Sequence, residues 1–466
     1  MIVEELHDSP PADRIARSLR GRPGFFYLDS ARTEGNERPA FSFIGFDPFL
    51  TWSAKDETVV VESDGKREEL AQNPLTHLRQ MMERYRCSRA AEIPFCGGAV
   101  GYFGYEFGAR EQRVRASGRD VPAIPDAMFG FHDGVIAIEH SSGRTYAIAQ
   151  PVAGRSAAEI LTKLRDAVRE ASGDKVGAGD LGRAITPSGV EPASNLTKDD
   201  YLRRVTKVKE YIAAGDVYQV NLSQRFEMQT ADEPYAIYER LRQFSPAPFG
   251  AYLDAGSFQI LSSSPELLLR VDDHGHALTR PIKGTRPRGT TPAEDQRLAA
   301  ELFASEKDHA ELLMIVDLER NDLGRVCRYG SIQVEERHRI ETHPTVFHLV
   351  ATVVGQLREN RDVFDCLRSM LPGGSITGAP KIRAMQLIDE LEPCRRHVYT
   401  GSLGYLGFDG TCDLNIAIRT ILCRAGRANY HVGGGIVSDS DPEAEYQETL
   451  AKGRAMRAAV MGEEKT

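Results

Sequence analysis

The sequence predicts an α+β fold in a globular chain of 466 residues. Segments typical of strands and of helices are mixed along the chain without the regular strand–helix alternation of a doubly wound sheet. Hydrophobic residues make up 41% of the chain and charged residues 27%, which is typical of an ordinary globular protein. At about 150 residues per domain, this length allows two or three modules or one large interlocked domain.

The first part of the chain, residues 1–170, is expected to form a β-rich region. Short alternating apolar runs occur at 41–50, 58–63 and 134–150, and a Ser-Ser-Gly turn divides the last of them. Residues 171–196 are rich in Gly, Pro and Ser. This composition indicates an exposed linker, and an ordered long loop is an equal alternative.

Residues 197–460 carry sharper signals and are expected to form the catalytic region. Thr197, followed by Asp200, predicts a helix N-terminus, and Gly215 predicts its end. Further helices are expected to begin near residue 291, near residue 305 and, with Ser440 and Glu443 as a capping pair, near the C-terminus. Strands are expected at 345–356, 415–423 and 428–437.

Charge and cysteine usage exclude several classes of function. The chain has 58 Lys+Arg against 67 Asp+Glu, a net charge of −9, and no basic tract, so we expect no binding to nucleic acid or to an anionic membrane. No apolar run approaches the roughly 20 residues of a membrane span. The acidic N-terminus lacks a hydrophobic stretch, so we expect no secretory signal. The seven cysteines are scattered without a CxxC pair, which argues against disulfides or a zinc site. A cytoplasmic enzyme is the expectation.

Acidic residues on two expected helices point to a metal. Glu311 shares a helix face with Ile315, and a carboxylate on an apolar face is costly unless it is paired or binds a cation. Asp308 lies one turn earlier, and Glu445 and Glu448 share a face of the last helix. Carboxylates without nearby His or Cys suit Mg²⁺. The alternative, a solvated acidic first turn, is less compatible with Glu311.

Two residues are candidates for acid and nucleophile chemistry. Lys283 lies in the segment PIKGTRPRGTT, close to Arg286 and Arg288, and nearby cations lower the pKa of a lysine and favour its nucleophilic form. Glu266 begins an apolar run, and a half-buried carboxyl group with a raised pKa can act as a general acid. The alternatives are a solvated turn lysine and an exposed turn carboxylate.

Glycine-rich segments provide candidate anion sites. GGSITGAPK at 373–381 has the spacing of a phosphate loop, but Ala379 stands where the lysine is required. The turn expected at 433–435 can present backbone N–H groups to an anion. Arg419, expected on a strand face with its apolar neighbours, requires a carboxylate from the protein or from a substrate. His348 is as compatible with a buried core histidine as with a pocket residue.

Taken together, these segments resemble the chorismate-utilising enzymes. They occur in the family's order across about residues 198–455, and the N-terminal half is similar to the less specific N-terminal region of these enzymes. The resemblance implies two orthogonally packed sheets flanked by helices, an α/β/β/α arrangement with one active site between the layers. The matching segments are GDVYQVNLSQRF, SSSPE, RPIKGTRPRG, AELLMIVDLERNDLGR, PGGSITGAPK, YTGSLGYL, NIAIRT, GGGIVSDS and EAEYQET.

The resemblance also implies roles for individual residues. Glu311 and Glu448 match the Mg²⁺ ligands, with Asp308 and Glu445 beside them. Glu266 matches the general acid. The residues that match the substrate pocket are Arg419, Tyr399, His348 and Thr285, with the backbone of Gly433, Gly434 and Gly435. Leu28-Asp29-Ser30 is similar to the tryptophan-binding motif of anthranilate synthases, with Asp in place of Glu, so a regulatory site is an open question.

Within the family, the segment PIKGT resembles the aminodeoxychorismate synthases, whereas anthranilate synthases carry alanine where Lys283 stands. This implies that Lys283 is the nucleophile in replacing the C4 hydroxyl of chorismate by an amino group. None of the seven cysteines lies in a G-x-C-x-G elbow, so ammonia is expected from a separate glutamine amidotransferase subunit. The alternatives are anthranilate synthase component I and a non-catalytic chorismate-binding module.

Overall fold

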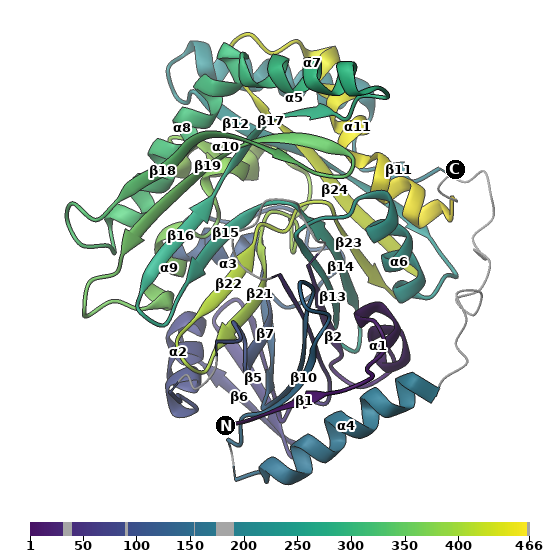
Figure 1. Ribbon diagram of the computed structural model, residues 1–466. Coiled ribbons are helices and arrows are strands. Elements are labelled where there is room, and N and C mark those ends of the chain that lie inside the picture. Colours follow the sequence, from purple (N-terminus) through teal and green to yellow (C-terminus); the bar gives the residue numbers. More distant parts are fainter. Residues whose placement is uncertain (31–39, 89–91, 153, 174–190, 464–466) are drawn as a thin grey trace.

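The computed structural model describes residues 1–30, 40–88, 92–152, 154–173 and 191–463. Over these ranges the chain forms two 12-stranded antiparallel sheets with helices on their outer faces (Figure 1). This confirms the predicted α+β fold with two sheets flanked by helices. Most of the predicted linker, residues 174–190, lies outside the described residues.

The first sheet contains strands from both ends of the chain. In spatial order its strands are β1 (Ile2–Leu6), β10 (Thr145–Ala149), β9 (Gly134–Glu139), β3 (Phe41–Gly45), β2 (Phe26–Asp29), β13 (Phe249–Asp254), β14 (Gln259–Ser264), β23 (Thr420–Arg424), β24 (Arg427–Ile436), β12 (Gln219–Gln229) and β11 (Ala193–Ser194), and β20 (Gly378–Ala379) also pairs with β12.

The second sheet has the same mixed origin. Its strands are β17 (Ile282–Pro287), β19 (Val346–Gln356), β16 (His276–Arg280), β15 (Leu267–Val271), β22 (Cys412–Asn415), β21 (Ser402–Gly407), β7 (Gly98–Phe103), β8 (Ala127–His132), β4 (Leu50–Lys55), β5 (Thr58–Ser63) and β6 (Lys66–Ala71), and β18 (Gln333–Thr342) also pairs with β19.

The sequence regions 1–170 and 197–460 therefore meet within both sheets. In the first sheet they join where β2 pairs with β13, and in the second where β7 pairs with β21. Each junction is an ordinary antiparallel ladder. The backbone N–H and C=O groups along the facing edges of the two strands are therefore satisfied by residues of the opposite sequence region.

Apolar side chains fill the space between the sheets and cover their outer faces. Phe43 and Ile260 of the first sheet pack with Tyr102 and Leu403 of the second in the central layer. The outer face of the first sheet is covered by α1 (Ala12–Leu19), α4 (Ala157–Gly173), α6 (Pro234–Phe244) and α11 (Pro442–Met461). The outer face of the second is covered by α2 (Pro74–Arg84), α8 (Glu306–Gly324) and α9 (Val363–Met370).

The described residues form four further helices, which are shorter or peripheral. α5 (Lys198–Ala213) and α10 (Lys381–Leu391) pack together against β12. α3 (Tyr105–Glu111) follows β7 directly, and α7 (Pro292–Phe303) lies near β17. Figure 1 shows α5, α7 and α8 gathered at one end of the molecule and α4 at the other. A 3₁₀ turn, η1 (Gly374–Ile376), precedes β20.

The helix-start predictions hold with one correction. Thr197 forms a reciprocal capping box with Asp200, and α7 and α8 begin after Thr291 and Ser305. For α11 the N-cap is Asp441 rather than the predicted Ser440, because the Asp441 carboxylate accepts the N–H of Ala444. The Ser440 hydroxyl instead donates to Glu445.

No helix in the described part of the chain is both long enough and apolar enough to cross a membrane.

Candidate active site

Two neighbouring crossings between the sheets form the centre of the site. β14 belongs to the first sheet and β15 to the second, so the chain passes between the sheets at Glu266. It crosses back between β22 and β23, at residues 416–419. The two crossings are hydrogen-bonded, because Ile416 donates its N–H to the Glu266 carbonyl at 2.9 Å and Ser263 donates to the Arg419 carbonyl at 3.1 Å. Glu266 and Arg419 therefore both lie where the chain passes from one sheet to the other.

The predicted single strand at 415–423 is therefore wrong. Its two halves, β22 and β23, pair in different sheets, and Arg419 between them has φ of +51°. This left-handed backbone breaks the alternation of faces on which the predicted orientation of Arg419 depended. A periodic apolar run does not reveal such a crossing, because both halves remain buried.

Glu266 is a buried carboxyl group at the first crossing. Its side chain is only 4% exposed, and the N–H of Ile282 donates to Oε1 at 3.3 Å. Burial raises the pKa of Glu266, and the Ser375 hydroxyl and the charge of Lys283 oppose this rise. A carboxyl group that retains its proton in a buried position can act as a general acid.

Lys283 projects from β17, one residue after the N–H that contacts Glu266. Burial lowers the pKa of its amine, Glu311 and Glu266 oppose this, and Lys452 lowers it further. Its amine has no hydrogen bond or ion pair to another residue in the described ranges, so it is available to a ligand. The structure thus places a lysine of reduced basicity beside a general-acid candidate.

The cations named from the sequence as the cause of this lowered pKa are not the relevant ones. Arg286 donates to Asp308 at 3.1 Å and to Glu301 at 3.2 Å. Arg288 forms a bidentate pair with Asp295. The cation that acts on Lys283 is Lys452 of α11, which the sequence analysis missed.

Carboxylates from α8 and α11 lie near enough to Lys283 to raise the pKa of its amine. Glu311 is partly buried, and burial raises its pKa, as do the charges of Asp308 and Glu448, while Lys283 lowers it. The pKa of Glu448 is lowered overall. Partial burial acts to raise it, but the Lys452 ammonium, 2.7 Å from Oε1 of Glu448, outweighs this effect. The two predicted metal ligands therefore lie close enough to repel each other.

Their predicted helpers have other partners. Asp308 pairs with Arg286, and Glu445, which is 9% exposed, accepts the Ser440 hydroxyl at 2.6 Å. Within the described residues, no group of three or more His, Cys, Asp or Glu side chains could hold a metal ion. Among the predicted ligands, Glu311 has no ion-pair partner in the described ranges and Glu448 pairs with Lys452, so a metal held by these two residues stays a prediction. Two carboxylates with other ligands from substrate are typical of Mg²⁺ sites.

The glycine-rich segment 433–435 lies in strand β24 rather than in the predicted turn. β23 pairs with β24 only as far as Tyr430, so beyond that residue no strand of the described residues pairs with this edge of β24. Lys452 donates to the Gly433 carbonyl at 3.0 Å on this edge. In an antiparallel ladder alternate residues point their N–H groups to the same edge, so Gly433 and Gly435 can offer theirs to an anion. A Cβ at Gly434 would lie 3.0 Å from Glu445 Oε2.

Arg419 supplies a guanidinium group that is not neutralised. Its Nη1 lies 3.5 Å from the Ser245 hydroxyl, and none of the described carboxylates forms an ion pair with it. Burial lowers its pKa and Glu266 opposes this effect. A partly buried arginine without a carboxylate partner is suited to bind a ligand carboxylate.

His348 and Thr285 are cross-strand neighbours on β19 and β17. The Thr285 hydroxyl and His348 Nδ1 lie 2.9 Å apart. Burial, together with Arg419 and His343, holds the pKa of His348 well below its usual value, so the ring is neutral.

Tyr399 is a buried residue of the connection from α10 to β21. Its ring stacks on His431, with ring centres 5.0 Å apart, and the Arg396 guanidinium lies 5.6 Å from its centroid. Burial raises the pKa of its phenol, which therefore remains a hydrogen-bond donor.

Asp29 of the possible tryptophan site is engaged by the protein itself. It lies at the end of β2, is 7% exposed, and accepts hydrogen bonds from Arg242 at 2.8 Å and Tyr27 at 2.9 Å. The N–H of Ser30 bonds to the Ser42 hydroxyl, and Leu28 packs in the central layer.

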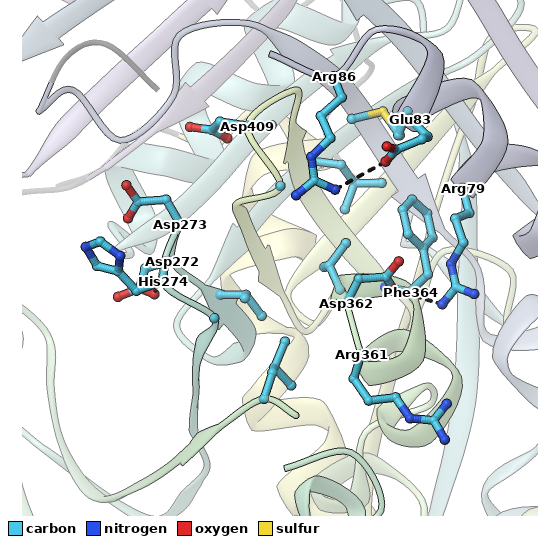
Figure 2. A pocket seen from close by; sticks show the side chains of 18 of the residues that line it. Arg79, Glu83, Arg86, Asp272, Asp273, His274, Arg361, Asp362, Phe364 and Asp409 are labelled. Carbon is cyan, nitrogen blue, oxygen red and sulfur yellow. Dashed lines mark hydrogen bonds and ion pairs between the residues drawn. The ribbon is translucent and has the colours of Figure 1, made fainter. Parts of the chain in front are cut away.

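A cavity of about 310 Å³ lies elsewhere, between α2 and the turns at 272–275 and 407–410 (Figure 2). Figure 2 shows Arg79 beside Asp362 and Arg86 beside Glu83, pairs that are 2.8 and 3.2 Å apart. Its lining includes none of the predicted site residues.

Two residues of the site were missed from the sequence. Lys452 could have been found, because it lies four residues after Glu448 on the same helix face. Arg396, buried under Tyr399, could not, because its neighbours Arg395 and His397 give its segment a polar character typical of a surface loop.

Comparison with known proteins is consistent with this geometry. The family model for chorismate binding enzymes matches residues 24–458. The chain is 39% identical over 445 residues to anthranilate synthase component 1 of Acetivibrio thermocellus, covering 93% of this chain and 90% of that protein. It is also 39% identical over 435 residues to aminodeoxychorismate synthase component 1 of Bacillus subtilis, covering 91% and 90%.

A solved structure gives the same result. The crystal structure of anthranilate synthase component I from Streptococcus pneumoniae matches with a TM-score of 0.80 and 31% identity, over 92% of this chain and 94% of that one. The match of fold, of sequence and of nearly the whole length leads to one conclusion: the chain belongs to the chorismate binding enzyme family.

Proposed function

We propose that this protein is an aminodeoxychorismate synthase, which converts chorismate and ammonia to 4-amino-4-deoxychorismate. The observation that carries the proposal is the amine of Lys283, which has reduced basicity and lies among Glu266, Glu311 and Glu448. The 39% identity to the Bacillus subtilis aminodeoxychorismate synthase component 1 supports it.

The chain's own residues account for each proton and bond in this reaction. The neutral Lys283 amine adds at C2 of the ring while the Glu266 carboxyl group gives its proton to the C4 hydroxyl, which leaves as water. Ammonia then adds at C4, the C2–N bond breaks, and Lys283 returns as an amine. The Glu266 carboxylate recovers a proton from the new C4 ammonium group.

Substrate binding follows from the charges around this centre. Arg419, Tyr399 and the free edge of β24 at Gly433 and Gly435 are donors suited to carboxylate groups. Thr285 and neutral His348 line the same region. Mg²⁺ held by Glu311 and Glu448 would bind a second carboxylate and reduce the charge of a dianionic substrate.

Ammonia would come from a separate glutamine amidotransferase subunit. The support is the absence of a G-x-C-x-G nucleophile elbow in the sequence and the word "component" in the names of the matching relatives.

Anthranilate synthase component I is a second candidate, favoured by the names of the Acetivibrio thermocellus and Streptococcus pneumoniae relatives. The two candidates differ in product. The test is mass spectrometry of the product formed from chorismate, Mg²⁺ and ammonium by the purified chain. The proposal predicts 4-amino-4-deoxychorismate without pyruvate. Anthranilate with pyruvate would identify the second candidate, and the absence of turnover would indicate a non-catalytic binding module.

A further inference from the structure

The segment that carries Tyr399 has an unusual backbone. Residues 392–401 connect α10 to β21 without regular structure, and both His397 (φ +53°) and Thr400 (φ +60°) adopt the left-handed conformation. Residues with a Cβ occupy this conformation at an energetic cost, so the surrounding structure must hold them in place. The question is which contacts do so.

Glu106, in the first turn of α3, contacts this segment most directly. Its Oε1 accepts the N–H of Arg396 at 2.8 Å and its Oε2 accepts the N–H of His397 at 3.0 Å. The preceding N–H, of Tyr105, donates to the His397 carbonyl at 2.7 Å. Three hydrogen bonds thus join two consecutive residues of α3 to two consecutive residues of the Tyr399 segment.

The Arg396 side chain extends this contact into the site. Its guanidinium group forms two hydrogen bonds with Glu392, at 2.8 and 2.6 Å, and lies over the Tyr399 ring. It also donates to the carbonyl groups of Ile376, beside Ser375, and of Asn221 on β12, at 3.1 and 2.7 Å. Because the backbone of Arg396 is fixed by Glu106, the position of this group depends on Glu106.

The burial of Glu106 indicates that its carboxylate has a specific role. The residue is 4% exposed, and desolvation of a carboxylate is unfavourable unless its oxygens are used. Both oxygens are used here, and both serve one adjacent pair of peptide groups. An ionised carboxylate, which is the form of Glu106 above about pH 7, can accept two diverging N–H groups. A glutamine amide cannot do so, because one of its ends is a donor.

We propose that Glu106 is a positioning residue of the active site, which sets the place of Tyr399 through the backbone N–H groups of Arg396 and His397. The inference rests on the proposed role of Tyr399 in substrate binding. It gives residues 1–170 a direct part in the site.

The first test compares two chemically identical substitutions, Glu106→Gln and Glu239→Gln. Glu239 of α6 is also buried, at 6% exposure, and bonds to Arg17 at 2.9 Å on the outer side of the first sheet. We expect Glu106→Gln to raise KM for chorismate roughly 10-fold or more, with a smaller change in kcat, because a misplaced Tyr399 weakens substrate and transition state alike. Glu239→Gln should leave KM unchanged, and the melting temperature of each variant is measured in parallel.

The second test is a double-mutant cycle with Tyr399→Phe. If Glu106 acts through Tyr399, adding Glu106→Gln to Tyr399→Phe changes KM little further. Multiplicative effects on KM would show that Glu106 acts independently of Tyr399 and would overturn the proposal. Where Glu106→Gln fails to fold, Glu106→Asp takes its place in the cycle with the same criterion, and a wild-type KM in either folded variant also overturns the proposal.

This test is separate from that of the proposed function. KM refers to chorismate whichever product forms, so formation of anthranilate would refute the proposed product while the cycle still decides the role of Glu106. If the wild type turns over no chorismate, the proposed function fails, and the same cycle is measured as the dissociation constant of chorismate by calorimetry.

Discussion

At the scale of single residues, the feature that distinguishes the site is that two of its positively charged side chains have no ion-pair partner in the described ranges. Lys283 and Arg419 have no ion-pair partner among the described residues, while Arg286 and Arg288 nearby are fully engaged. The unpaired groups are therefore where substitution should change chemistry rather than stability.

Lys283→Ala should lose most formation of 4-amino-4-deoxychorismate, and residual amination should move toward C2. The reason is that covalent attachment at C2 blocks ammonia there and directs it to C4. Lys283→Arg should not restore activity, because a guanidinium group stays protonated. The measurement is product analysis with excess ammonium, with the exposed Lys207→Ala as a control. Production of 4-amino-4-deoxychorismate by Lys283→Ala at the wild-type rate would refute the covalent mechanism.

Glu311→Gln should abolish turnover and weaken Mg²⁺ binding while leaving the melting temperature nearly unchanged, because one of two carboxylates is neutralised. Calorimetric titration of Mg²⁺ in the presence of chorismate gives a readout apart from activity. Glu306→Gln, an exposed change in the first turn of the same helix, is the control. Full activity of Glu311→Gln in EDTA would rule out the metal assignment.

Glu106 should make the stability of the protein depend on pH. Burial raises its pKa to about 7, with Asp126 adding to the rise and Arg395 and two backbone N–H groups opposing it. Since the unfolded chain releases this proton at lower pH, the folded state binds more protons between about pH 4.5 and 7. The free energy of unfolding should therefore fall by roughly 3 kcal/mol across this range from Glu106 alone and stay level above it.

Urea unfolding at pH 5 and pH 8 measures this effect. Glu106→Gln lacks the titrating group, so its free energy of unfolding relative to the wild type should rise from pH 5 to pH 8. A difference that does not vary with pH would contradict the raised pKa.

At the scale of elements, local signals were predictable and changes of sheet were not. Strands β19 and β24 and the starts of α5, α7 and α8 agree with the sequence because caps and apolar periodicity depend on nearby residues. The crossing between β22 and β23 depends on pairing partners that are distant in sequence, and the contact of Glu106 with His397 spans 291 residues. The carboxylates were singled out by residue type and spacing. The pairing of Glu448 with Lys452, four residues later on α11, was within reach of the sequence, whereas the pairing of Asp308 with Arg286 required the fold.

The capping box of α5 offers a test at this scale. Thr197→Ala removes the hydroxyl that accepts the N–H of Asp200 and should lower the free energy of unfolding by about 1 kcal/mol. Thr206→Ala, the same change in the exposed middle of α5, should raise the free energy of unfolding by a few tenths of a kcal/mol, because alanine has the higher helix propensity. Thermal unfolding of both variants checks this, and equal stability of the two would argue against the cap.

At the scale of the whole molecule, the site draws on both sheets and both regions of the chain. The crossings from β14 to β15 and from β22 to β23 supply Glu266 and Arg419, and β17, β19 and β24 with α8 and α11 supply the other charged and donor groups. α3 supports the Tyr399 segment. The α+β class was predictable from the sequence. That residues 1–170 and 197–460 share both sheets was not, because the Gly-rich stretch at 171–196 suggests a boundary between separate domains.

The purified chain should aminate chorismate with free ammonium and should not use glutamine. Glutamine should become a substrate only after addition of a separate amidotransferase subunit, because no nucleophile elbow for its hydrolysis is present in the sequence. Parallel assays with ammonium and glutamine as nitrogen source measure this. Glutamine-dependent amination by the single chain would contradict the two-component proposal.

The junctions of β2 with β13 and of β7 with β21 also constrain how the protein is made. While the ribosome is still synthesising the second half of the chain, the strand edges of β2 and β7 lack the partners that will cover them. Uncovered strand edges pair readily with other chains, so the nascent N-terminal half is a substrate for chaperones until β21 emerges. A chain truncated by a premature stop codon after residue 200 should therefore aggregate or be degraded rather than accumulate as a stable domain.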